Sequence, residues 1–149
     1  MTTSIKIAGR AIEILHVEDN FGDAGVMKQV LKKAGFPNRL TNVNTGEAAL
    51  DFLNRRNAFS AAVQPDVVLL DLKLPGKDGL GVLNEIRQSE VLKNIPVIVL
   101  TGSESDLDLD WANRLKANHY VVKPFEVEGY KELTDILRKI WMKTFHKQA

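Results

Sequence analysis

Short apolar segments that end in polar residues alternate with amphipathic segments along this chain, and this alternation constrains the fold most. The run Val67–Leu70 is wholly apolar and leads directly into Asp71 and a turn containing Pro75 and Gly76. Such a run is typical of a strand that is buried on both faces of a parallel sheet. Open α/β sheets bind ligands beyond the carboxyl ends of these strands. Asp71 is therefore predicted to lie at a ligand-binding edge.

Three other predicted strands also end in polar side chains. The pairs of strand and following group are Ile12–Val17 with Glu18 and Asp19, Val97–Leu100 with Thr101, and His119–Val122 with Lys123. A fifth, shorter strand is predicted over Leu40–Val43. Helices are predicted between and after the strands, from apolar residues at helical spacing and from capping residues. They cover about 23–34, 46–56, 79–89, 106–117 and 126–145.

The order of elements is (βα)5, which right-handed crossovers convert into a doubly wound parallel sheet. The expected strand order is 2-1-3-4-5, so the first and third strands flank the point where the order reverses. This topology brings Glu18 and Asp19 next to Asp71. No internal repeat or second domain is indicated. We expect a flexible lead-in over residues 1–10, one domain over 11–145 and no output domain.

Composition excludes several classes of function. The 149 residues carry a net charge of only +1, which gives no reason to expect nucleic-acid binding. The absence of cysteine excludes disulfides and thiolate chemistry, and it is compatible with a cytoplasmic setting. No apolar stretch approaches the ~20 residues of a membrane span.

The three carboxylates at the sheet edge predict a metal site. Like charges within ~4–6 Å raise at least one pKa unless a cation is present. Oxygen ligands suit Mg²⁺, which commonly adds substrate phosphate oxygens to one or two carboxylates. Asp71 can then serve as metal ligand and nucleophile, since carboxylates form aspartyl phosphates. Thr101 offers a hydroxyl and Lys123 an ammonium to the phosphoryl group. Each residue alone is more often structural, so the prediction depends on their combination.

At these residues the chain resembles the receiver domains of two-component response regulators, which have the CheY-like (flavodoxin-like) fold. The match covers about residues 12–142. It implies that Asp71 accepts a phosphoryl group from a sensor histidine kinase, and that the protein is no enzyme beyond self-phosphorylation from small phosphodonors and autodephosphorylation. It implies Mg²⁺ bound by Asp19, Asp71, Glu18 through water and the Lys73 main-chain carbonyl. Lys123 matches the phosphate-contacting lysine.

The resemblance also implies a switch and a backbone feature. Thr101 and Tyr120 match the pair that couples phosphorylation to the surface formed by the helix over 106–117, the strand over 119–122 and the final helix. The Lys123–Pro124 peptide is expected to be cis. Glu18 departs from the family's more usual Asp. The long 57–65 connection and the tryptophan-bearing final helix look like the response regulators that serve phytochrome kinases.

Aromatic and aliphatic residues near the end of the chain leave two interpretations open. Ile136, Trp141 and Phe145 extend the apolar surface of the final helix, and Trp111 is expected on the same side of the molecule. They either pack against the N-terminal lead-in or form a homodimer interface, in which aromatic residues are enriched.

Three other functions share parts of this pattern. A dehalogenase-type phosphatase needs a second acid two residues after the nucleophile, where this chain has Lys73. An FMN carrier would have its phosphate repelled by Glu18 and Asp19. The serious alternative is a receiver-like module that binds other proteins independently of phosphorylation, although none of the expected site residues is missing.

Overall fold

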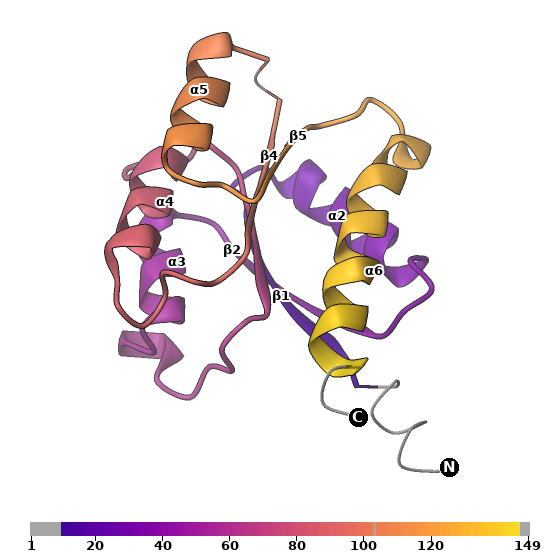
Figure 1. Cartoon of the computed structure of the whole chain (residues 1–149), viewed down its shortest axis with the longest axis horizontal. Helices are drawn as coiled ribbons and strands as arrows, with labels where there is room; N and C mark the ends of the chain where they lie inside the picture. The colour runs from indigo at the N-terminus through magenta and orange to yellow at the C-terminus, as the bar shows by residue number, and fades with distance from the viewer. Residues whose placement is uncertain (1–9, 103, 147–149) are drawn as a thin grey trace.

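The computed structural model describes residues 10–102 and 104–146 as alternating strands and helices around one sheet (Figure 1). The strands are β1 (Ile12–Val17), β2 (Asn38–Val43), β3 (Val67–Leu70), β4 (Val97–Thr101) and β5 (His119–Val122). The helices are α2 (Phe21–Lys32), α3 (Gly46–Leu53), α4 (Gly79–Gln88), α5 (Asp106–Arg114) and α6 (Lys131–His146), with short 3₁₀ turns η1 (Asn57–Phe59) and η2 (Val127–Tyr130).

All five strands are parallel, and their order is β2-β1-β3-β4-β5, as predicted. β1 lies between β2 and β3, pairing Val17 with Val43 on one side and with Leu70 on the other. β3 and β4 are buried along their whole length, which explains why their sequences are continuously apolar. The (βα)5 doubly wound fold is confirmed.

Two apolar layers hold the helices against the sheet. Helices α3, α4 and α5 cover one face, and α2 and α6 cover the other (Figure 1). On the first face, Leu83 and Ile86 of α4 are fully buried against inward-pointing strand residues. On the second, Met27 of α2 and Leu133 and Leu137 of α6 are buried. Each helix thus contributes the apolar stripe that the sequence pattern indicates.

Most element boundaries follow the predicted capping residues. Thr45 and Ser105 are N-caps, and β5 has the predicted limits. α2 begins earlier than predicted, because the Asn20 side chain accepts a hydrogen bond from the Asp23 N–H and starts the helix there. β2 also begins earlier, since its pairing with β1 already starts at Asn38.

Two helices end earlier than predicted, at residues that adopt positive φ. α3 ends at Leu53, and Arg55 follows with a φ of 54°. α5 ends at Arg114, and Lys116 follows with a φ of 63°. Left-handed residues after the last turn terminate a helix, and here they are not glycine, the residue that normally signals such an end.

The expected lead-in lies almost entirely outside the described residues, which begin at Arg10. Within the described ranges, no helix combines the length and apolarity that crossing a lipid bilayer requires.

Candidate phosphoacceptor and metal site

The backbone of the candidate site continues the hydrogen-bond ladder of the sheet. Just past β3, the Asp71 N–H donates to the Val17 carbonyl over 3.1 Å. Just past β5, the Lys123 N–H donates to the Thr101 carbonyl over 2.8 Å. The site residues are therefore fixed by the same pairing that orders the strands, and their side chains project from a rigid edge.

The three predicted carboxylates converge. One carboxylate oxygen each from Glu18, Asp19 and Asp71 lies within 4.8 Å of the others. Glu18 and Asp71 are buried, whereas Asp19 is exposed. An all-oxygen donor set of this kind fits a hard divalent cation, and the exposed Asp19 leaves a side from which an ion and its waters can enter.

Lys123 reaches into this cluster and forms three ion pairs. Its Nζ lies 2.6 Å from Glu18 Oε1, 2.8 Å from Asp23 Oδ2 and 3.0 Å from Asp71 Oδ2. The Lys123 side chain is only 15% exposed, so these pairs are poorly screened by water. Lys123 is thereby in reach of any group carried by Asp71.

Asp23 is a site residue that the sequence interpretation missed. The sequence pattern places Asp23 only at the start of a helix, where acids are common for electrostatic reasons. Recognising Asn20 as the N-cap would have placed Asp23 in the first turn of α2, beside the end of β1. Even so, the sequence contains no direct signal for its contact with Lys123.

The charges of the cluster shift one another's protonation. Burial alone would raise the pKa of Asp71, but hydrogen bonds from Lys123 and the Lys73 N–H hold that pKa below its ordinary value. Burial raises the pKa of Glu18, against the opposing hydrogen bond from Lys123. Burial tends to lower the pKa of Lys123, yet its bonds to Asp23, Glu18 and Asp71 raise it. Asp71 is thus kept as an ionised, nucleophilic carboxylate.

The loop after Asp71 is closed tightly onto the start of α4. The Gly79 N–H donates to the Leu72 carbonyl, and Asp78 caps the helix by accepting from the Gly81 N–H. A Cβ atom at Gly79 would lie 2.1 Å from the Asp71 carbonyl oxygen. Only glycine permits this approach, so Gly79 helps to fix the backbone of Asp71.

The remaining predicted site residues lie around this cluster. Thr101 ends β4 and is fully buried, and Gly102 next to it leaves open space where a side chain would be. Tyr120 is partly buried against the apolar layer under α3, α4 and α5. The Lys73 N–H binds Asp71 Oδ1 over 3.1 Å. Metal binding by the Lys73 carbonyl and switching by Thr101 and Tyr120 stay predictions.

The predicted cis peptide is wrong. The bond between Lys123 and Pro124 is trans, as are all peptide bonds in the described parts of the chain. The trans form of an X–Pro bond is favoured by about 0.5–1 kcal/mol, and here it already delivers the Lys123 ammonium to the carboxylates.

The proposed dimer residues lie on two helices, α5 and α6. Trp111 is exposed on α5, which covers one face of the sheet, and α6 covers the other face, so their expected common side, along the edge strand β5, stays a prediction (Figure 1). The Trp141 indole N–H donates to the Arg10 carbonyl over 2.8 Å, and its ring stacks on Phe36. Trp141 thus packs within the chain, as in the first of the two interpretations.

The other two proposed dimer residues, Ile136 and Phe145, belong to α6. Ile136 is partly buried against the apolar layer beneath α2 and α6. The side chain of Phe145 lies outside what the structure describes. Formation of a dimer therefore stays a prediction.

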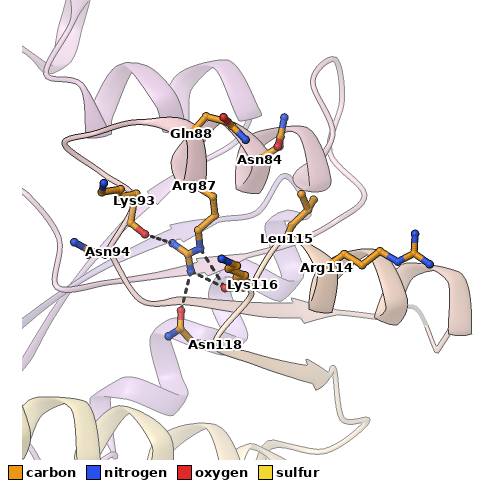
Figure 2. A pocket seen from close by; sticks show the side chains of 9 residues that line it. All are labelled: Asn84, Arg87, Gln88, Lys93, Asn94, Arg114, Leu115, Lys116 and Asn118. Carbon is orange, nitrogen blue, oxygen red and sulfur yellow. Dashed lines mark hydrogen bonds between the residues drawn. The ribbon is translucent and has the colours of Figure 1, made fainter.

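A hollow of about 470 Å³ lies at the opposite, amino end of the strands (Figure 2). The Arg87 guanidinium lies in it and donates to the main-chain carbonyls of Lys116, Lys93 and Ile95 and to Asn118 Oδ1. Two further cations of its lining are paired with acids, as Lys93 with Glu90 and Arg114 with Asp110. Its charges serve the fold, and the strand-end cluster remains the candidate site.

Comparison with known proteins agrees with this geometry. The probable methanogenesis regulatory protein FilR2 of Methanothrix harundinacea is 40% identical over 129 residues, covering 87% of this chain and 83% of that protein. The response regulator Rcp1 of Synechocystis sp. is 35% identical over 131 residues, covering 88% and 89% of the two chains.

Solved structures show the same similarity. The phosphorylated cyanobacterial phytochrome response regulator RcpA superimposes with a TM-score of 0.82 at 32% identity, covering 91% of this chain and 96% of that one. The Mn²⁺-bound form of Rcp1 superimposes with a TM-score of 0.76 at 35% identity, covering 90% and 94%. The model of the response regulator receiver domain matches residues 14–137. The chain belongs to the response regulator receiver family, close to the response regulators of phytochrome systems, and is a phosphoacceptor rather than an enzyme in the usual sense.

Proposed function

We propose that Asp71 is the phosphoacceptor and that it receives its phosphoryl group from a phosphohistidine of a sensor kinase. The observation that supports this proposal is the position of the Asp71 carboxylate relative to the other acids and to Lys123. Its carboxylate lies within a cluster of three acids suited to a divalent ion, and the Lys123 ammonium is 3.0 Å from one of its oxygens. Glu18 shares the lysine, but Asp71 is the acid that follows β3, the middle strand of the sheet.

We assign Mg²⁺ to this cluster, with Glu18, Asp19, Asp71 and the Lys73 carbonyl as its protein contacts. The all-oxygen donor set supports a hard cation, and a related receiver, Rcp1, has been solved with Mn²⁺. When bound, such an ion neutralises phosphoryl oxygens and lowers the repulsion between them and the acids. The protein's own groups do the rest by position and charge.

The transfer step follows from these positions. An Asp71 carboxylate oxygen attacks phosphorus, the P–O bond forms, and the P–N bond to the donor imidazole breaks. The electron pair of that bond stays on the imidazole nitrogen, which takes up a proton. Lys123 is placed to pair with a phosphoryl oxygen, and the Thr101 hydroxyl is the proposed second contact. Loss of the group is the attack of water on phosphorus, which returns the Asp71 carboxylate and free phosphate.

The readout is proposed to run through Thr101 and Tyr120 to the surface formed by α5, β5 and α6. A phosphoryl group adds about −1.5 to −2 charge, which attracts hydroxyl donors. Moving a two-state element from 1:99 to 99:1 takes ~5.5 kcal/mol. One charge-assisted hydrogen bond supplies about 1.5–3 kcal/mol, so Thr101 and Lys123 have to act together.

The proposed partners are a sensor histidine kinase, in particular a phytochrome, and a second copy of this chain. The phytochrome assignment rests on the similarity to RcpA, a phytochrome response regulator. The dimer rests on the exposed Trp111 of α5. The cytoplasm is the proposed setting, with which the absence of cysteine is compatible.

Intact-mass measurement after incubation with acetyl phosphate and Mg²⁺ tests the phosphoacceptor. We expect an added mass of about 80 Da, that of one phosphoryl group on a carboxylate nucleophile, in the wild type. Asp71→Asn should abolish it, and Asp106→Asn on the exposed start of α5 should not. A wild type without the adduct would instead favour the binding module that is independent of phosphorylation.

A further inference from the structure

The contact between Asp23 and Lys123 is not explained by metal binding or by phosphoryl transfer. Of the three acids that bind the Lys123 ammonium, Glu18 and Asp71 also belong to the group suited to hold an ion. Asp23 binds Lys123 at 2.8 Å and does not belong to that group among the described residues. Among the described residues, Lys123 is the only cation that forms an ion pair with Asp23.

Asp23 comes from a different element and is held firmly. Its backbone N–H is bound by the Asn20 side chain at 2.9 Å, which fixes the first turn of α2. Met27 and Leu31 then anchor that helix in the apolar layer beneath it. The Asp23 side chain is 41% exposed, at the outer side of the cluster. It thus reaches Lys123 from a helix, whereas Glu18 and Asp71 follow strands.

Entry of an ion changes what Lys123 can bind. The cluster contains four carboxylates, Glu18, Asp19, Asp23 and Asp71, against one ammonium. An ion that takes oxygens from Glu18 and Asp71 removes electron density from two of the three acceptors of Lys123. Asp23 is the acceptor that the ion leaves intact. Without it, both of the remaining carboxylate acceptors of the ammonium would be shared with the ion.

We propose that Asp23 is a positioning residue that keeps the Lys123 ammonium at the site when a divalent ion occupies Glu18, Asp19 and Asp71. An ammonium has three donors, so Lys123 can bind Asp23 and a phosphoryl oxygen at once. This inference rests on the proposed function and adds to it the residue that orients the lysine.

Nuclear magnetic resonance of the lysine ammonium groups tests this directly. An ammonium that is hydrogen-bonded and shielded from water exchanges its protons slowly and gives a resolved signal. We expect such a Lys123 signal in the wild type both without and with Mg²⁺. In Asp23→Asn it should be resolved without Mg²⁺, where Glu18 and Asp71 still bind it, and be lost when Mg²⁺ is added. Asp23→Glu should restore it at least in part.

The rate of phosphorylation by acetyl phosphate at saturating Mg²⁺ supplies the second readout. We expect Asp23→Asn to slow it by roughly twofold to fivefold, the range for a single partly exposed charge pair. Asp106→Asn is the matched control, since it removes an acid from the first turn of α5, away from Lys123. The backbone amide spectrum of each variant shows that it is folded.

The outcomes separate this inference from the function on which it rests. A Lys123 signal that survives Mg²⁺ in Asp23→Asn, or one that Mg²⁺ abolishes in the wild type, overturns the positioning role. An unchanged rate in Asp23→Asn does the same while leaving Asp71 as the phosphoacceptor. Only the absence of an adduct on the wild type removes the proposed function.

Discussion

A partly buried cation lies at each end of the sheet, Lys123 at one and Arg87 at the other, and the two are held in opposite ways. At the carboxyl end, the ammonium of Lys123 is bound by three carboxylates. At the amino end, the guanidinium of Arg87 is bound by neutral oxygens, those of Lys93, Ile95, Lys116 and Asn118 (Figure 2). One set of acceptors carries negative charge, which attracts a divalent ion, and the other is neutral.

This difference separates a reactive site from a structural one. Carboxylates attract any cation, so an ion can take over acceptors from Lys123 and the arrangement is exchangeable. The carbonyls of Lys93, Ile95 and Lys116 lie in the segments that follow α4 and α5, and the planar guanidinium satisfies them at once. A partly buried positive charge therefore indicates a reactive site or a structural one only once its hydrogen-bond acceptors are known.

The largest expected effect comes from removing the exchangeable cation. Lys123→Met leaves the buried Glu18 and Asp71 without their counter-ion, so the metal-free protein should lose about 3 kcal/mol of unfolding free energy. Urea denaturation of the wild type and of Lys123→Met measures this loss of unfolding free energy. Mg²⁺ should restore a larger part of the stability in this variant than it adds to the wild type. Equal effects of Mg²⁺ on both proteins would contradict the idea that ion and ammonium share acceptors.

Acid should destabilise the carboxyl end in particular. Burial, helped by the nearby Lys123 charge, lowers the pKa of His16 in β1 from 6.5 to about 4. The unfolded chain takes up this proton below pH 6.5, whereas the folded protein resists it until about pH 4. Stability should therefore fall as pH falls through this window, by up to ~3 kcal/mol.

Urea denaturation across that pH window checks the prediction. His16→Gln cannot take up the proton and should show a flatter dependence, whereas a change at Arg87, which stays charged throughout, should leave the slope as it is. If His16→Gln has the same slope as the wild type, the acid sensitivity arises elsewhere.

Removing the structural cation should affect stability and not chemistry. Arg87→Met leaves the carbonyls of Lys116 and Ile95 without their donor, at a cost of about 2 kcal/mol, moderated by access of water. Mg²⁺ should restore none of this loss, and the folded variant should be phosphorylated like the wild type. Urea denaturation measures the loss of stability, and intact mass measures the phosphorylation. A strong loss of phosphorylation in the folded variant would show that the two ends are coupled.

The smallest effect is expected on the surface of α5, away from both cations. Trp111 is 44% exposed and contacts the Arg114 guanidinium in the same helix. Trp111→Ser should change the unfolding free energy by less than about 0.5 kcal/mol. If Trp111 belongs to a dimer interface, sedimentation of the phosphorylated protein should show weaker association. A wild type that sediments as a monomer at high concentration, with and without acetyl phosphate, removes the dimer.

The strand-end chemistry could be predicted from the sequence. A polar residue directly after an apolar run lies at the carboxyl end of a strand, and these ends share one edge of a parallel sheet. Glu18, Asp19, Asp71 and Lys123 are brought together as expected. The element order and the strand order follow from the same alternation. The ends of α3 and α5 could not be predicted in this way, because the residues with positive φ that follow them, Arg55 and Lys116, are not glycine.

Three features lay beyond such patterns for physical reasons. Asp23 meets Lys123 across two elements, and an acid in a first helical turn has an ordinary electrostatic explanation. Arg87 binds mainly main-chain oxygens. Every residue has such an oxygen, so the acceptors of Arg87 cannot be identified from the sequence. Trp141 binds the carbonyl of Arg10, and only the folded chain brings the two together.

The placement of the two tryptophans gives this protein a pair of built-in optical reporters. Trp111 is exposed on α5, and Trp141 is partly buried between Phe36 and the chain at Arg10. Their fluorescence should differ in emission wavelength and in access to a soluble quencher. With either one replaced by phenylalanine, the other reports on its own face of the sheet without any attached dye.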